Sequence, residues 1–402
     1  MTRVFCGKHK EFRDKKGGID ALTESYLDNA ATTSVLPAAA QAAMEAMTQC
    51  WGNPSSLHGR GIEAHLLLER AREDVAAALG CGKEELTFTS GATESNNLAL
   101  FGAARAKRRR GRRIVTTAFE HSSVIGAMGQ LQKEGFDVVF VPPEPDGTLP
   151  PEKIAEQVDK NTILVSTMFV NNELGTILDI SRIGRLIKRQ NPDVLYHCDA
   201  VQAFCKEPFK AARLGVDLLS VSSHKIHGPK GCGALYLKKG VRIEPIVFGG
   251  AQERGLRPGT EALPLIAAFA AAAKESSQHM AGSRDHICAL NASLRARLSD
   301  LDGVFINSPD TASPYILNAS VTGVRSEIML HALEERGVYV SSGSACAKGE
   351  PSHVLSALGL SRPLADSALR ISFTYESTQA HVDALIDSLR DLIPRYRASR
   401  RG

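Results

Sequence analysis

The feature that most constrains this chain is a lysine placed directly after a buried strand. The apolar run Val216 to Val221 predicts that strand, and Lys225 follows between Ser222-Ser223-His224 and the glycine-rich turn Gly228-Pro229-Lys230-Gly231. An amine in this position costs free energy unless it is paired or used covalently. Schiff-base chemistry is such a use, because desolvation lowers the pKa of the amine toward its neutral, nucleophilic form. A lone lysine is more often a surface residue, so its neighbours decide between the two interpretations.

A carboxylate ends the apolar strand before this one. Asp199 closes the run that starts at Asp193, and it lies 26 residues before Lys225, one strand–helix–strand unit earlier. This spacing predicts that both residues lie at the carboxyl edge of one parallel sheet. A buried aspartate can keep the pyridine nitrogen of pyridoxal 5'-phosphate (PLP) protonated, so that the ring acts as an electron sink. A helix N-cap is the ordinary alternative for such an aspartate.

Three further strand ends carry groups suited to the same cofactor. One strand leads through a glycine turn into a helix whose first N–H groups, at Ala92 and Thr93, would hold a phosphate. The next strand delivers His121, which would stack on the cofactor ring, and another ends in amides at Asn172. Each signal is weak alone, since capping or a structural histidine explains it equally well. Together, phosphate, aromatic, amide, carboxylate and lysine chemistry at five strand ends favour a PLP site.

With these motifs in place, the chain resembles the PLP-dependent cysteine desulfurases of the NifS/IscS type, within the aspartate-aminotransferase-like superfamily. The resemblance covers nearly the whole chain. Its motifs are Tyr26–Thr33, Gly52–Ser56, Ser90–Glu94, Glu120-His121, Val170–Glu173, His197–Gln202, Val221–Gly231, Gln252–Thr260, Ser341–Cys346 and Arg370–Phe373. The sequence departs from the family pattern at Ser223 and Ala251, which replace glycines, and in a shorter segment after Cys346. It also has a long, charged N-terminal segment over residues 1–25.

The resemblance implies a role for each site residue. The cofactor-binding residues would be Ala92, Thr93, His121, Asn172, Asp199, Gln202, Ser222, His224, Lys225 and, from the other subunit of a homodimer, Thr260. The substrate carboxylate would be bound by Arg370 with Asn53 and Asn172, because the planar guanidinium fixes its orientation. Lys225, His121 and Cys346 would be the catalytic residues. No metal site is expected.

Cys346 lies in a segment of small, polar residues that is typical of a mobile surface loop. Lys348 would bias its thiol toward the thiolate, whereas the bland alternative is an incidental cysteine. The other seven cysteines have apolar or helical surroundings and no CxxC spacing, which indicates neither a metal site nor disulfides. The implied reaction converts L-cysteine to L-alanine and leaves sulfur as a persulfide on Cys346. Acceptor proteins would then use the sulfur for Fe–S cluster assembly, tRNA thiolation or both.

The alternation of strands with helical runs such as Ile62–Leu79 predicts an α/β fold with helices on both faces of a parallel sheet. The resemblance specifies the PLP-dependent transferase fold type I, with a mostly parallel seven-stranded sheet in the large domain. We expect this domain at residues 37–276. A smaller α+β domain, formed by residues 1–36 and 277–402, would carry the Cys346 loop. The chain of 402 residues, 43% apolar, is ample for both.

Composition limits the alternatives. No apolar stretch approaches the ~20 residues that span a bilayer, and the start lacks the apolar segment of a signal peptide. Together with unpaired cysteines, this indicates the cytoplasm. The net charge of +4 gathers in basic runs at 105–113 and 395–401, which are typical of solvated faces, so direct nucleic-acid binding is not expected. Rival functions are another PLP enzyme, such as an aminotransferase or selenocysteine lyase, and a PLP-fold subunit without activity.

Overall fold

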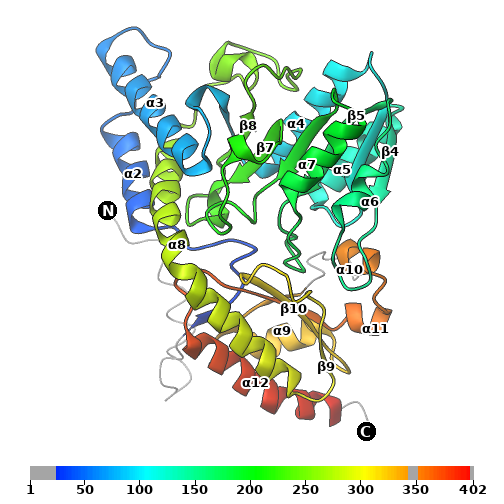
Figure 1. Ribbon diagram of the computed structural model, residues 1–402. Coiled ribbons are helices and arrows are strands. Elements are labelled where there is room, and N and C mark those ends of the chain that lie inside the picture. The colour runs from blue at the N-terminus through cyan, green and yellow to red at the C-terminus, as the bar shows by residue number, and fades with distance from the viewer. Residues whose placement is uncertain (1–23, 343–351, 399–402) are drawn as a thin grey trace.

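The larger part of the molecule is built on a twisted seven-stranded sheet (Figure 1). The computed structural model describes residues 24–342 and 352–398. The strand order is β2-β8-β7-β6-β5-β3-β4, and all neighbours pair in parallel except β8, which is antiparallel to both of its neighbours. The predicted mostly parallel, seven-stranded sheet is therefore confirmed. The strands are β2 Leu86–Thr89, β3 Arg113–Thr117, β4 Asp137–Val141, β5 Thr162–Met168, β6 Leu195–Asp199, β7 Leu218–Ser222 and β8 Gly233–Leu237.

Both faces of this sheet are covered, because successive residues of a strand point to opposite sides. Ile114 and Leu164 pack with α4 and α5 on one face, whereas their neighbours Val115 and Val165 join a second core on the other. The central strands β5, β6 and β7 therefore have no solvated face and are buried throughout. The helices of the large part are α2 Pro37–Thr48, α3 Gly59–Leu79, α4 Ala92–Lys107, α5 Ser122–Lys133, α6 Pro151–Ala155 and α7 Ile180–Gln190.

A single helix, α8 (Leu263–Ser299), links the large part to the small part (Figure 1). Its first half packs against α2 and α3, and its second half packs against α12 and β9. The expected domain boundary at residue 276 lies inside this helix, at a polar stretch that starts at Lys274. The stretch contains no proline, and its polar residues are compatible with a helix that faces solvent between two cores.

The small part combines a four-stranded antiparallel sheet with helices. The sheet order is β12-β13-β10-β9, from Ser341–Ser342, Ala368–Ser372, Ile316–Val321 and Val304–Ile306. The N-terminal strand β1 (Ser25–Tyr26) pairs in parallel with β11 (Val338–Tyr339), which attaches the start of the described chain to this part. The helices are α9 Ser326–Glu334, α10 His353–Ala357, α11 Arg362–Ala365 and α12 Gln379–Ala398.

Two properties of this fold bear on function. The strands β3, β5, β6 and β7 are parallel, so their carboxyl ends meet at one edge of the sheet. Over residues 24–342 and 352–398, no helix combines the length and the apolar character that a membrane crossing needs.

Candidate active site

A cavity of about 700 Å³ opens at the carboxyl edge of the large sheet, and we call it the Lys225 cavity. The strand-end residues predicted from the sequence lie together on its wall. Those residues are Ala92, Thr93, His121, Asn172, Asp199, Gln202, Ser222, His224, Lys225 and Arg370. The small part contributes Arg370 and Ser341, so the cavity lies where the two parts of the molecule meet.

One end of the cavity is suited to a phosphate. Gly91 has a φ of 151°, which favours glycine, and it turns the chain from β2 into the 16-residue helix α4. The free N–H groups and positive dipole end of this helix face the cavity at Ala92 and Thr93. Ser222 and His224, from the end of β7, lie on the same wall. The combination of a helix N-terminus with side-chain donors is a donor set that fits a phosphate ester.

Asp199 supplies a buried carboxylate at the end of β6. Its side chain is 5% exposed and accepts hydrogen bonds from Asn96 Nδ2 at 2.8 Å and from the Val201 N–H at 3.1 Å. These two hydrogen bonds fix the orientation of the carboxylate. The aspartate is therefore ready to hold a cationic N–H group of a ring in the cavity.

His121 is held in one orientation at the start of α5. Its Nδ1 accepts the Ser123 N–H at 3.2 Å and lies 2.8 Å from Ser123 Oγ. The acceptor role of Nδ1 places the ring proton on Nε2. Burial of the ring lowers the pKa of His121, and the Asp199 charge partly offsets this. The ring is thus a neutral imidazole at physiological pH.

Lys225 has the depressed basicity that its position predicts. It ends a short helical turn, Ser223–Lys225, and its Nζ lies 2.6 Å from both Ala30 O and Ala31 O. Burial lowers the pKa of Lys225 to about 7, with further lowering by the positive charges of Lys206 and Arg370. A large fraction of the amine is therefore neutral at physiological pH, as Schiff-base formation requires.

Arg370 presents a guanidinium that is already oriented. Its Nη2 donates to Asp28 Oδ1 at 2.8 Å and its Nη1 donates to Asn172 O at 3.1 Å. Arg370 Nε and Asn172 Oδ1 are both buried and have no partner in the structure. Buried polar groups without partners are rare in folded proteins, and here they lie on the wall of a ligand-sized cavity. Arg370 Nε–H is suited to an oxygen of a ligand, and Asn172 Oδ1 is suited to an N–H or O–H group of a ligand.

Three predicted site residues are not brought to this wall. Asn53 lies in the α2–α3 loop, where its Oδ1 accepts the Ser55 N–H at 2.9 Å, and Thr260 follows the short turn η4 (Gln252–Gly255). Both adjoin a separate surface groove that includes Ser55, Gln252 and Glu261. Cys346, with the neighbouring Lys348, lies outside the described residues.

Several wall residues were not singled out from the sequence. Asp28, Ala30 and Ala31 come from the N-terminal segment. Asn96, which was not singled out either, lies behind the wall, one turn into α4, where it bonds to Asp199. Asp28 stands in a motif that was visible in the sequence, Tyr-Leu-Asp-Asn, but its pairing with Arg370 spans 342 residues. No local signal reveals such a contact.

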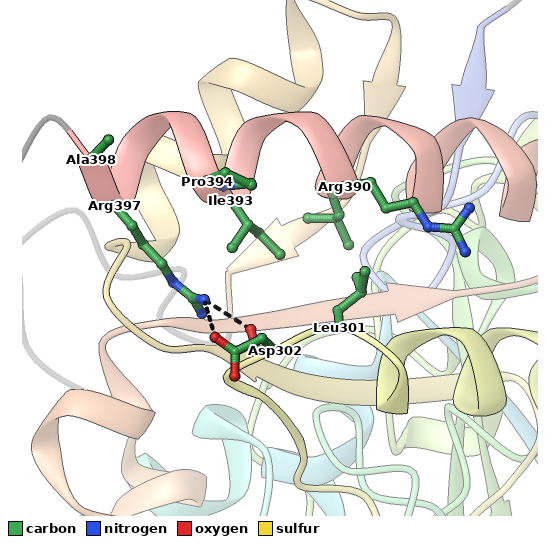
Figure 2. Close-up of a pocket in the computed structure, with 8 residues that line it drawn as sticks. Leu301, Asp302, Arg390, Ile393, Pro394, Arg397 and Ala398 are labelled. Carbon is green, nitrogen blue, oxygen red and sulfur yellow. Dashed lines mark hydrogen bonds and ion pairs between the residues drawn. The ribbon is translucent and has the colours of Figure 1, made fainter.

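A second hollow of about 490 Å³ lies on the small part, between α12 and the end of α8 (Figure 2). Leu301, Ile393 and Pro394 form its apolar floor, and an ion pair between Arg397 and Asp302 closes one side (Figure 2). The charged residues that line it are Asp302, Arg390 and Arg397.

The sheet and the Lys225 cavity together define a PLP-dependent enzyme of fold type I. The chain belongs to the aminotransferase class-V family, whose profile matches residues 25–385. It is 40% identical over 376 residues to a NifS/IcsS protein homolog of Lactobacillus delbrueckii subsp. bulgaricus, covering 92% of this chain and 97% of the relative. It is 37% identical to the cysteine desulfurase IscS of Methanosarcina thermophila, covering 92% of each.

Solved structures agree with this assignment. A NifS-like protein superposes with a TM-score of 0.88 at 39% identity, covering 92% of this chain and all of that one. The DndA protein of Streptomyces lividans superposes with a TM-score of 0.74 at 38% identity, covering 87% of this chain and 99% of that one. The family profile, the relatives and the solved structures therefore agree on the fold, the family and the dependence on PLP.

Proposed function

We propose that the protein is a cysteine desulfurase, which converts L-cysteine to L-alanine and passes the sulfur to an acceptor protein. The observation that carries this proposal is the convergence of Lys225, Asp199 and Arg370 on one cavity with a phosphate-binding helix end. The names of relatives such as the Methanosarcina thermophila IscS support cysteine as the substrate. An oriented arginine in the cavity is suited to an amino-acid carboxylate.

The cofactor is held by residues of five strand ends. Ala92, Thr93, Ser222 and His224 would bind its phosphate, and Asp199 would hold its ring nitrogen. His121 would stack on the ring, whereas Gln202 and Asn172 would contact its phenolic oxygen. When bound, PLP withdraws electrons from the substrate carbon that carries the amine.

The substrate is oriented by the small part and deprotonated from the large part. Arg370, already fixed by Asp28, would bind the carboxylate through its unpartnered Nε–H, with Asn172 beside it on the same wall. Lys225, once its amine is displaced, would move the proton of the substrate Cα, because a base with a pKa of about 7 is matched to neutral pH. His121 Nε2–H would donate a hydrogen bond to a ligand in the same cavity.

Sulfur transfer would be carried out by Cys346. Its thiolate attacks the substrate sulfur, a sulfur–sulfur bond forms, and the carbon–sulfur bond breaks with its electron pair left on carbon. That carbon takes up a proton and becomes the methyl group of alanine. The resulting persulfide on Cys346 would be passed to an Fe–S scaffold or a tRNA-thiolating protein.

A homodimer is part of the proposal, because Thr260 is expected to reach the phosphate of the other subunit. An exposed apolar surface on α2, α3 and the loops around them supports a partner there. Met44, Met47 and Trp51 are 56–65% exposed, and Leu57 is 95% exposed. Apolar exposure on this scale is typical of an interaction surface. Asn53 lies within this surface, so its predicted contact with substrate would also require the dimer.

The remaining assignments follow the same reasoning. Residues 37–276 would form the large domain, with residues 1–36 and 277–402 in the small domain. All six cysteines in the described part of the chain are free, and Cys198 and Cys232 among them are buried, so a reducing compartment such as the cytoplasm is proposed.

The deciding experiment incubates the purified, PLP-loaded protein with L-cysteine and dithiothreitol, and it measures alanine and sulfide. Equal amounts of both are expected. Formation of a keto acid would indicate an aminotransferase, and turnover of selenocysteine alone would indicate a selenocysteine lyase. A protein that binds PLP without any turnover would be a binding subunit.

A further inference from the structure

A second buried lysine lies behind the wall of the Lys225 cavity. Lys206 is 6% exposed and shares a small hollow of about 20 Å³ with Lys225. Among the described residues its amine enters no ion pair, since the nearby Glu207 bonds to Arg284 and to Ser313, each at 2.6 Å. A buried ammonium without a carboxylate partner costs free energy. A functional role would explain why it is there.

Lys206 is connected to the cavity through Gln202. The two residues lie four apart in the turns that follow β6. Lys206 Nζ donates to Gln202 Oε1 at 3.3 Å. Because an ammonium only donates, the amide oxygen must face Lys206 and the NH2 group must face the other way. There Gln202 Nε2 donates to Ala30 O at 2.9 Å, and the same oxygen accepts from Lys225 Nζ.

We propose that Lys206 is a positioning residue of this site: it fixes the Gln202 amide with its NH2 group toward the cavity, and it holds a positive charge behind Lys225. The proposal rests on the proposed function, for which Gln202 must offer a donor. An amide has two N–H bonds, and only one is used by Ala30 O. The other remains for an oxygen of a ligand in the cavity, which Gln202 lines.

Burial and the positive charge of Lys206 both lower the pKa of Lys225. Burial lowers the pKa of Lys206 to about 8, so it is mostly charged at pH 7. That charge, after burial itself, is the main cause that lowers the pKa of Lys225. The other charged groups that face the two amines are Arg370, Asp28, Asp199 and Glu207. The histidines nearby have pKa values lowered by burial and are neutral; they are His121, His224 and His227.

The test compares two neutral substitutions in the PLP-loaded protein. Lys206→Met keeps most of the length of the side chain but removes both the charge and the donor, whereas Lys206→Gln removes the charge and keeps a donor. The matched control is Lys188→Met, which removes a partly buried lysine that bonds Asp217 at 2.8 Å, away from the cavity wall. The visible absorption of the bound cofactor reports protonation at Lys225. Its midpoint pH is measured together with kcat and KM for L-cysteine.

Loss of the charge should raise the midpoint by about one pH unit in both Lys206 variants, because a nearby like charge disfavours protonation. Loss of the donor should lower kcat about tenfold in Lys206→Met, with a smaller change in KM and partial recovery in Lys206→Gln. A Lys206→Met protein with the midpoint and kcat of the Lys188→Met control overturns the proposal. If Lys206→Met does not fold, an unshifted midpoint in Lys206→Gln overturns it. A wild-type protein that forms no alanine instead refutes the proposed function.

Discussion

Replacing Asn96 by leucine is expected to weaken PLP binding by about ten- to a hundredfold. Asn96 is fully buried, and its Nδ2 donates to Asp199 Oδ2 at 2.8 Å and to Ser123 Oγ at 2.9 Å. Ser123 in turn holds His121 Nδ1, so one amide positions both the carboxylate and the ring of the site. A hydrogen bond to a charged group contributes about 1.5–3 kcal/mol, which corresponds to that range of affinities.

Leucine has a branched shape similar to that of asparagine, and it removes an amide oxygen that has no partner in the structure, Asn96 Oδ1. Folding should therefore suffer less than binding. The neighbouring Asn97 is the matched control, because it is exposed to solvent at its amide and donates only to Thr93 O, within its own helix. PLP titration of the apo proteins, followed by absorbance, gives the dissociation constants, and thermal unfolding measures stability. If Asn96→Leu binds PLP within twofold of Asn97→Leu, the amide does not tune Asp199 and the reasoning is wrong.

Three further outcomes are expected. Lys225→Ala should abolish the yellow colour of the PLP-loaded protein, and retention of the visible band would exclude Lys225 as the attachment site. Cys346→Ser should still bind PLP yet release no sulfide from cysteine, because a hydroxyl cannot replace the thiolate; turnover at the wild-type rate would contradict this. Glu120→Gln should flatten the pH dependence of stability, because burial raises the pKa of Glu120 to about 8. The pKa of Glu120 in the folded protein is above its value in the unfolded chain. The contribution of Glu120 to stability is therefore lost as pH rises from about 4.5 toward 8, by roughly 1.4 kcal/mol for each pH unit. Equal melting curves for the wild type and the variant from pH 6 to 9 would refute this prediction.

The strand-end residues could be placed from the sequence because the carboxyl ends of parallel strands lie at the same edge of the sheet. Once Asp199 and Lys225 are assigned to successive strands, their side chains must lie at the same sheet edge. Asn96 and Lys206 could not be found this way, since each acts from behind the wall through another side chain. Their contacts depend on how α4 and the turn after β6 pack, which no local pattern encodes.

The limits of the sequence are clearest for α8. A polar stretch from Lys274 lies at the expected boundary, and α8 continues through it to Ser299. Long-range contacts hold this stretch, since the buried Ser276 donates to Ile226 O at 2.9 Å and His279 stacks on Tyr375. The positions of Asn53 and Thr260 show a different limit. A motif identifies such residues, but a single chain places them in a surface groove away from Lys225. The dimer proposed above would bring them to a cavity.

The charges around the cavity determine what it can hold. Lys225, Lys206 and Arg370 contribute positive charge, whereas Asp28 is paired with Arg370 and Asp199 lies on the opposite side with Asn96. The ligands that suit this arrangement are anionic at two places, near α4 and near Arg370, and cationic beside Asp199. A phosphate ester with a protonated ring nitrogen supplies the anion near α4 and the cation beside Asp199. An amino-acid carboxylate supplies the anion near Arg370. Its arrival would add negative charge near Lys225, which raises the pKa of that amine when it must take a proton.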